Sequence, residues 1–204
     1  MPRQPFGGRR LLPSLCAVVV ALATLVVVAP TPRAAALDDS DWLSIVNAYR
    51  AMSGLAPVVD EPGWTGGEVA HSCYMIQNDI THDERPGAPG YTVEGSAAGK
   101  NGNVAVSGSV AATARSHIDL WMTGPFHTIG ILRANLTRSA YGECKNADSP
   151  RWRAAATLDV LRGLDGSIPR PTTPIVYPGD GATVGVNRFV VESPDPLAMC
   201  NWSG

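Results

Sequence analysis

Two of the four histidines stand in predicted loops beside groups that could share chemistry with them. His82 is followed by Asp83 and Glu84, and His127 comes directly after Gly124-Pro125-Phe126. Imidazole nitrogens and carboxylate oxygens bind divalent metals, and imidazole also transfers protons near neutral pH. A cleft that brings the two histidines together would serve either purpose. The alternative interpretation is that backbone groups satisfy each ring separately.

The other two histidines, His71 and His117, fall within predicted helices, and we expect them at the surface or at the edge of the core.

The remaining motifs argue against other enzyme classes. The chain has no Gly-x-Ser-x-Gly turn, which counts against a serine hydrolase. The stretch Gly99-Lys100-Asn101-Gly102 leads to no Lys-Ser/Thr pair, so a phosphate-binding loop is not predicted.

Hydrophobic periodicity predicts three helices that would position these groups. The first follows a run of aspartates, covers residues 42–52 and ends at Gly54. The second covers 63–79, and a third apolar stripe runs from Ser107 until Gly124-Pro125 stops it. The inner face of the second helix is expected to carry Trp64, Val69, Cys73 and Ile76.

Strands and loops account for most of the rest. Residues 81–103 are rich in Gly and Pro and predict a long structured loop. A short buried turn is expected over 129–132. Residues 139–144 and 152–160 predict two strands, joined by a hairpin loop over 146–150.

The two ends of the chain differ in composition from the middle. Residues 1–36 combine three early arginines, an uncharged apolar run and Ala34-Ala35-Ala36, which is typical of a secretory signal. A retained membrane anchor is the alternative. Residues 37–165 are predicted to form the main domain. The Pro/Gly-rich segment 166–204 contains short β-prone runs, and we expect a β-ribbon or the beginning of a second domain.

Charge and cysteine content restrict the partners. Signal cleavage would remove four arginines and no acid, which lowers the formal charge from −2 to −6. Such an acidic chain is not expected to bind nucleic acid, and no membrane span would remain. Three cysteines would remain after cleavage: Cys73, Cys144 and Cys200. This odd number predicts one disulfide and one free thiol, but the sequence does not show which two cysteines pair.

Several segments, taken in order, resemble one known family. The segments are Leu43 to Arg50, His71 to Met75, Asn103-Val104-Ala105, Ile118 to His127, and Tyr141-Gly142. They resemble bacterial members of the CAP superfamily, the group of cysteine-rich secretory, antigen-five and pathogenesis-related proteins (SCP-like domains). The likeness extends over most of the chain after the signal.

The resemblance implies an α+β fold: an α-β-α sandwich with a small, mostly antiparallel sheet between helical layers. It also implies a cavity that many members line with two histidines and two glutamates. His82 and His127 match the histidine positions, and Asn103 matches a neighbouring asparagine. Glu94 is our candidate for the first glutamate, and Glu84 is a further cavity residue. The second glutamate has no counterpart, so zinc or another divalent metal on His82 and His127 is a candidate ligand rather than a required cofactor.

These observations predict a secreted binding or interaction module, located outside the cell or in the cell envelope. Its partner would be a lipid, a cell-wall component or another extracellular ligand. Two alternatives stay open at this point. One is a metal-dependent hydrolase that uses His82 and His127 around an activated water. The other is a structural cell-envelope protein whose cavity has lost its role.

Overall fold

The computed structural model describes residues 37–186, 188–190 and 192–198. The predicted signal, residues 1–36, and Cys200 lie outside these ranges. The described residues belong to one compact unit. In chain order its elements are α1 (Trp42–Met52), β1 (Val59–Asp60), α2 (Pro62–Asn78), α3 (Val93–Asn101), β2 (Gly102–Ser107), α4 (Ala114–Trp121), α5 (Pro125–Ile131), β3 (Arg138–Ser139), β4 (Tyr141–Lys145) and β5 (Ala154–Asp159).

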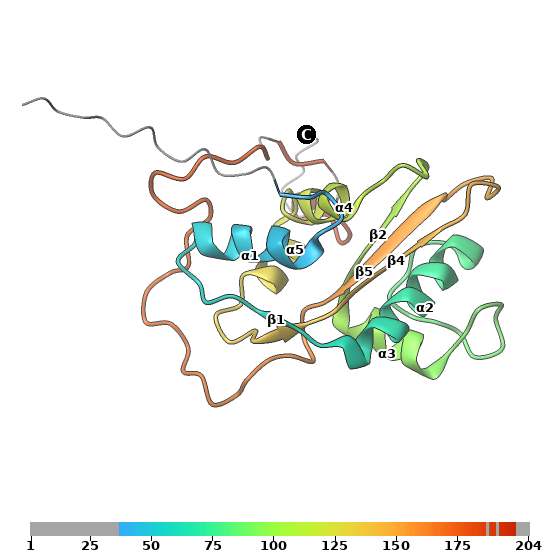
Figure 1. The fold of residues 1–204 in the computed structure, drawn as a ribbon, viewed down its shortest axis with the longest axis horizontal. Helices are drawn as coiled ribbons and strands as arrows, with labels where there is room; N and C mark the ends of the chain where they lie inside the picture. The colour runs from blue at the N-terminus through green and yellow to red at the C-terminus, as the bar shows by residue number, and fades with distance from the viewer. Residues whose placement is uncertain (1–36, 187, 191, 199–204) are drawn as a thin grey trace, which may run out of the picture. The chain divides into compact units, whose positions relative to one another are not determined.

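The main sheet is small and antiparallel, which confirms the predicted α+β class. Its strand order is β2-β5-β4, so the last strand in the chain lies in the centre. A separate two-residue parallel pair joins β1 to β3. Figure 1 shows α2 and α3 on one side of the sheet and α1, α4 and α5 on the other, which is the layered arrangement that the sequence predicts.

Alternating side chains give the sheet two apolar faces. On the side of α1, α4 and α5, Ala105 and Leu158 join the larger core, which also contains Trp121. On the opposite side, Val104 and Ala155 contact Met75 of α2. Both faces of the sheet are therefore covered by helices, as in a three-layer sandwich.

The first helix follows the sequence prediction closely. The Asp41 side chain accepts a hydrogen bond from the backbone N–H of Ser44 at 3.1 Å, which caps the N-terminus of α1. Gly54 lies just beyond the helix with φ +68°, a conformation that glycine adopts without steric cost. Ile45 and Val46 point into the core, as the spacing predicts.

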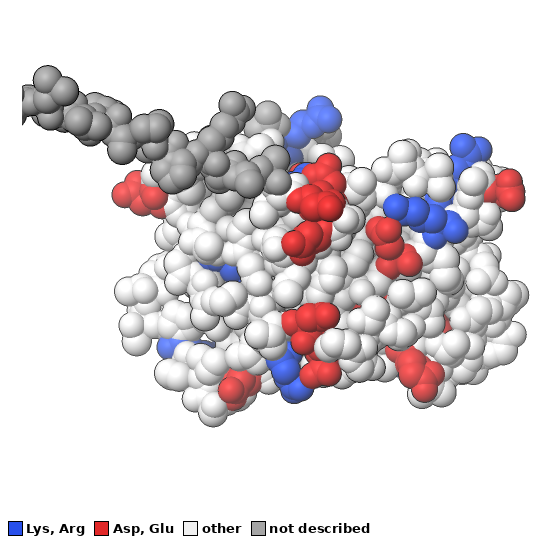
Figure 2. Space-filling view, viewed as in Figure 1, with Lys and Arg blue, Asp and Glu red and all other residues white. Residues whose placement is uncertain are grey.

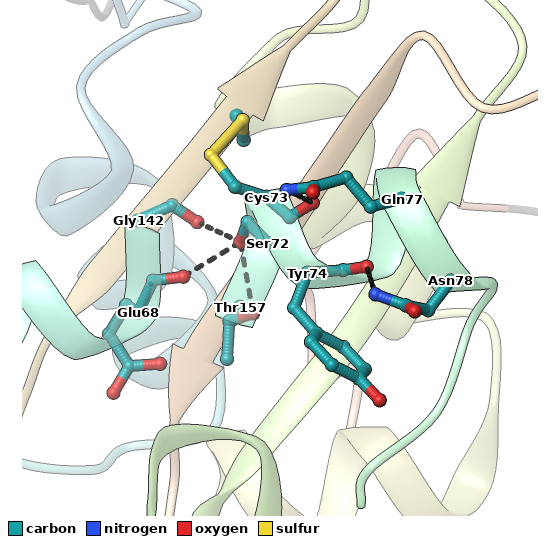
Figure 3. Close-up of a disulfide and its surroundings, with 9 residues drawn as sticks. Glu68, Ser72, Cys73, Tyr74, Gln77, Asn78, Gly142 and Thr157 are labelled. Carbon is teal, nitrogen blue, oxygen red and sulfur yellow. Dashed lines mark hydrogen bonds between the residues drawn. A yellow bond between two sulfur atoms is a disulfide. The ribbon is translucent and has the colours of Figure 1, made fainter. Parts of the chain in front are cut away.

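The predicted inner face of α2 is only partly right: Cys73 and Ile76 face the sheet, but Val69 does not. Val69 is exposed, whereas Glu68, His71 and Ser72 are fully buried. The helix is turned so that these polar side chains meet partners on the sheet and in the loops beside it. In Figure 3, the Ser72 hydroxyl lies within hydrogen-bonding distance of three oxygens: the Glu68 and Gly142 carbonyls and the Thr157 hydroxyl.

A glycine in β4 allows this close approach. A Cβ atom at Gly142 would lie 2.3 Å from the backbone nitrogen of Val69, a distance that no side chain tolerates. The missing side chain lets the α2 backbone rest directly on the strand. Cys73 of α2 and Cys144 of β4 form a disulfide at the same contact, which settles the pairing that the sequence leaves open (Figure 3).

The predicted loop over 81–103 is also partly wrong, because its second half forms α3 and the start of β2. The Thr92 hydroxyl accepts a hydrogen bond from the Gly95 N–H at 2.8 Å and begins the helix. Small residues and glycines make up most of α3, so it carries no apolar stripe that periodicity could detect.

The third predicted helix is shorter than its apolar pattern. It begins at Ala114, after a capping box of Thr113 and Ser116, and Val110 lies exposed before it. The expected buried turn over 129–132 is helix α5 and its C-cap, with Ile129 exposed. The two predicted strands and the hairpin between them are confirmed as β4 and β5.

The described part of the C-terminal segment contains no strand, so the expected β-ribbon is not seen in residues 166–186, 188–190 and 192–198. Instead the segment lies against the main domain. The Tyr177 ring meets Tyr49 of α1 edge-on, and Gly179 approaches the Met52 carbonyl. A domain boundary at residue 165 stays a prediction. Among all described residues, no helix has the length and apolar character needed to cross a membrane.

Candidate functional site

His82 is exposed, and one of its ring nitrogens is held in place. Nδ1 lies 2.8 Å from the carbonyl oxygen of Gly99 in α3. A carbonyl only accepts hydrogen bonds, so Nδ1 carries the proton and Nε2 of the neutral ring carries the lone pair. A backbone partner for this ring is what the second interpretation of the sequence predicts.

His127 has a carboxylate partner that comes from the C-terminal segment. Its Nδ1 lies 2.7 Å from Oε1 of Glu192, and its backbone N–H donates to the same oxygen at 2.8 Å. The Glu192 side chain is fully buried, and its second oxygen has no partner among the described residues. With Nδ1 donating to this carboxylate, Nε2 of the neutral ring again carries the lone pair.

Asn103 connects the two predicted site histidines to one short stretch of chain. Its side-chain amide donates to the His127 carbonyl at 3.0 Å, and it is buried on β2. Four residues earlier, Gly99 accepts from His82. Residues 99–103 thus contact the His82 ring at one end and the His127 backbone at the other, while a shared cleft between the two rings stays a prediction.

Glu84 is buried and pairs with His71, not with His82 or His127. Oε1 of Glu84 lies 3.0 Å from Nδ1 of His71, and Oε2 accepts from the Thr92 N–H. Nε2 of His71 donates to the Thr81 carbonyl at 2.9 Å. The pair therefore fastens the loop after α2 to the start of α3. Of the two positions expected for His71, the surface and the edge of the core, its complete burial excludes the surface.

The His71 ring also explains a glycine in α3. A Cβ atom at Gly99 would lie 2.2 Å from the ring. Helix α3 can therefore pack against α2 only because Gly99 has no side chain. The same residue supplies the carbonyl that holds His82, so one glycine positions both rings.

The described residues do not assemble a metal centre around the predicted ligands. Glu94 lies exposed in the first turn of α3. No group of three or more His, Cys, Asp or Glu side chains in the described ranges is arranged to hold a metal ion. A catalytic zinc needs three protein ligands, so His82 and His127 do not fit such a site on their own.

His117 is a second buried histidine, so it does not lie at the surface, which was one of the two positions expected for it. Its Nδ1 lies 3.2 Å from the Tyr141 hydroxyl, which donates to Glu143 at 3.1 Å. Since that proton points to Glu143, His117 donates from Nδ1, and its buried Nε2 has no partner among the described residues. Burial lowers the pKa of His117 to about 4, although the Glu143 charge opposes the shift and Lys145 adds to it.

We expect this histidine to make folding sensitive to acid. An unfolded histidine binds a proton below about pH 6.5, whereas folded His117 does so only below about pH 4. Unfolding therefore becomes easier as the pH falls through this window, by up to about 3 kcal/mol. His117→Gln should lose less stability than the wild type between pH 7 and pH 4.5 in urea unfolding.

The exposed His82→Gln is the matched control for this measurement. It keeps the buried histidine and should follow the wild-type pH profile. Equal acid sensitivity of the wild type and His117→Gln would contradict the assignment.

Glu68, a buried acid on α2, makes the stability of the fold change with pH in the opposite direction. Glu68 and Asp159 share the Arg162 guanidinium, which also lies over the Trp64 ring at 4.6 Å. Burial, and then the charge of Asp159, raise the pKa of Glu68 to about 8 against the opposing effect of Arg162. The folded protein therefore holds an extra proton between about pH 4.5 and pH 8, and this contribution to stability falls as the pH rises.

An apolar groove lies between α5 and the C-terminal segment. Its volume is about 520 Å³, within the usual range of about 300–1,000 Å³ for ligand pockets. The helix side contributes Ile129, which is 57% exposed, and the segment contributes Ile175 and Tyr177. Further apolar lining comes from Met122, Pro125 and Leu132.

Sequence reasoning could not have found the partners that complete these sites. Glu192 lies 65 residues beyond His127, in a segment without a motif or helical period. The groove likewise needs Ile175 and Tyr177 to meet α5, and no spacing in the sequence predicts that contact. The sequence shows that His71 belongs to one of the family-like segments. It does not show that His71 is buried, because this depends on how α2 is rotated about its axis.

The remaining evidence comes from comparison with known proteins. Neither a scan against protein-family models nor a search of curated proteins gives a match. The CAP-like motifs therefore stand as a prediction from the sequence, beside an α+β fold that the structure shows.

Proposed function

We propose that this protein is a secreted, CAP-like binding module that takes up a ligand with an apolar body in the groove between α5 and the C-terminal segment. The observation that carries the proposal is the groove itself, with its volume of about 520 Å³ and mostly apolar lining. Exposed apolar side chains gathered in one concave site are a usual sign of ligand binding.

Charge distribution supports a small or neutral partner over a polyanion. On the face that Figure 2 shows, Lys and Arg side chains occur in small separate groups among acidic ones. The described chain after the predicted signal is acidic overall. Binding a long polyanion would require a continuous basic surface.

The hydrolase alternative receives less support from the geometry. It requires a third ligand or a general base near both His82 and His127. Glu84 is engaged by His71, and Glu94 is exposed in α3. A binding role needs no such constellation.

A binding assay with a neutral apolar dye tests the proposal. We expect N-phenyl-1-naphthylamine to become fluorescent on binding to the wild-type protein. Ile129→Glu replaces an apolar wall of the groove by a carboxylate and should weaken the dye affinity by at least about tenfold, because a neutral dye bound there would remove water from that charge. Since Ile129 is largely exposed, its replacement should leave the free energy of unfolding nearly unchanged.

The matched control is Val93→Glu, an exposed apolar residue in the first turn of α3, in the other helical layer. It should bind the dye like the wild type. Absence of dye binding to the wild type, or equal binding by Ile129→Glu, would refute the groove as the ligand site.

A further inference from the structure

The groove has a cation among its lining residues. Arg133 follows α5 directly, lines the groove and is exposed. No carboxylate of the described residues lies within salt-bridge distance of its guanidinium: the ion pairs of this part of the chain involve other arginines. Its charge is therefore available to a bound molecule.

A second, buried cation lies behind the same end of α5. The Arg50 side chain is fully buried and donates to the carbonyls of Ile131 and Arg133, at 2.7 Å and 3.0 Å. It is balanced by carbonyl groups only, and among the described residues no acid pairs with it. Two arginines without a carboxylate partner among the described residues thus lie at this end of α5: Arg133 in the groove wall, and Arg50 buried behind it.

The carboxylate of Asp119 is directed elsewhere. Burial, and then the charge of Asp119, raise the pKa of the Tyr177 phenol, but this carboxylate accepts from the Tyr49 hydroxyl at 2.7 Å. It lines a separate, smaller pocket and not this groove. The Tyr177 hydroxyl is buried and has no partner among the described residues. The wall of the groove therefore holds a spare neutral hydrogen-bonding group besides the Arg133 cation.

Resting on the function proposed above, we infer that the ligand is a single-chain amphiphile with an anionic head group, whose apolar chain lies against Ile129 and Ile175 and whose head group binds Arg133. A guanidinium matches the geometry of a carboxylate or phosphate head group through paired N–H donors. The volume of about 520 Å³ is sufficient for one such chain.

Displacement of the bound dye by three twelve-carbon compounds below their micelle concentrations tests the inference. We expect dodecanoate to displace the dye at about fivefold lower concentration than dodecanol, and dodecylammonium to be weaker than dodecanol. The factor is that of one partly exposed ion pair. Dodecyl phosphate, as a fourth arm, tells a phosphate head group from a carboxylate.

Arg133→Gln should bring the displacing concentrations of dodecanoate and dodecanol to about the same value, each measured relative to the dye affinity of that variant. Arg85→Gln is the matched control, because Arg85 is also exposed, forms no ion pair in the described structure and lies in the loop before α3. It should keep the wild-type preference.

The possible failures are distinguishable. If the dye itself does not bind, the groove is not a ligand site and the proposed function fails. If the dye binds but dodecanoate and dodecanol displace it equally, the binding function stands and the anionic head group is refuted. Retention of the anionic preference in Arg133→Gln would refute Arg133 as its source.

Discussion

Replacing Arg50 by methionine is expected to destabilise the protein by more than about 3 kcal/mol. The guanidinium donates to four backbone carbonyls, one in the loop after α1 and three within residues 131–136. Methionine fills much of the same space but donates nothing, so buried carbonyls lose their partner at about 1–3 kcal/mol each. Urea unfolding monitored by tryptophan fluorescence measures the change.

Arg50 holds α1 to the chain after α5. Besides the carbonyls of Ile131 and Arg133, it reaches those of Ala56 and Leu136. Burial without a carboxylate lowers the pKa of the guanidinium, yet arginine stays charged across the working range. Arg50 therefore places a positive charge among the carbonyls at the C-terminal end of α5, where the helix dipole also favours a cation.

Two further variants make this prediction specific. Arg50→Lys keeps the charge but cannot reach all four carbonyls, so its loss of stability should be intermediate. Arg115→Met removes an exposed arginine that pairs with Asp39, and we expect it to cost less than about 1 kcal/mol. A similar small loss for Arg50→Met would show that the carbonyls find other partners.

The second large effect concerns the disulfide. Converting Cys73 and Cys144 to serine is expected to reduce the free energy of unfolding by about 4 kcal/mol, because the bond closes a loop with a sequence separation of 71 residues. The gain arises mainly from the restricted unfolded chain, so the native contacts between α2 and β4 should persist in the variant. Thermal and urea unfolding with and without reductant give the measurement.

Cys200→Ser serves as the control, since Cys200 is not part of this bond. It should unfold like the wild type, and reductant should lower its stability by the same amount. A loss below about 1 kcal/mol in the double variant would mean that the unfolded chain gains little freedom when the bond is absent.

Hydrophobic spacing determined the elements whose apolar residues repeat regularly. Helix α1 shows this most clearly, because Asp41 and Gly54 mark its ends and Ile45 and Val46 share one face. The β4–β5 hairpin was predicted for the same reason: two apolar runs flank a turn-forming loop. These signals are local, so no tertiary contact is needed to read them.

Helix α3 and the orientation of α2 could not be obtained in this way. Helix α3 is built from small residues and is held by the Thr92 cap and by close packing at Gly99. On α2, the polar residues Glu68, His71 and Ser72 are buried, although polar residues in a helical pattern normally predict a solvent-exposed face. Polar residues become buried only where partners exist, and those partners lie on other strands and loops.

The sequence by itself therefore determined the α+β class, the outer helix and hairpin, and the residues His82, Asn103 and His127 as site candidates. Only the tertiary structure decided that Glu192 partners His127, that Glu84 partners His71, and that α5 and the C-terminal segment form a groove. The physical reason is distance along the chain. A carboxylate, a carbonyl or an apolar wall acts on whatever lies within a few ångströms, and residues brought there by packing leave no spacing pattern in the sequence.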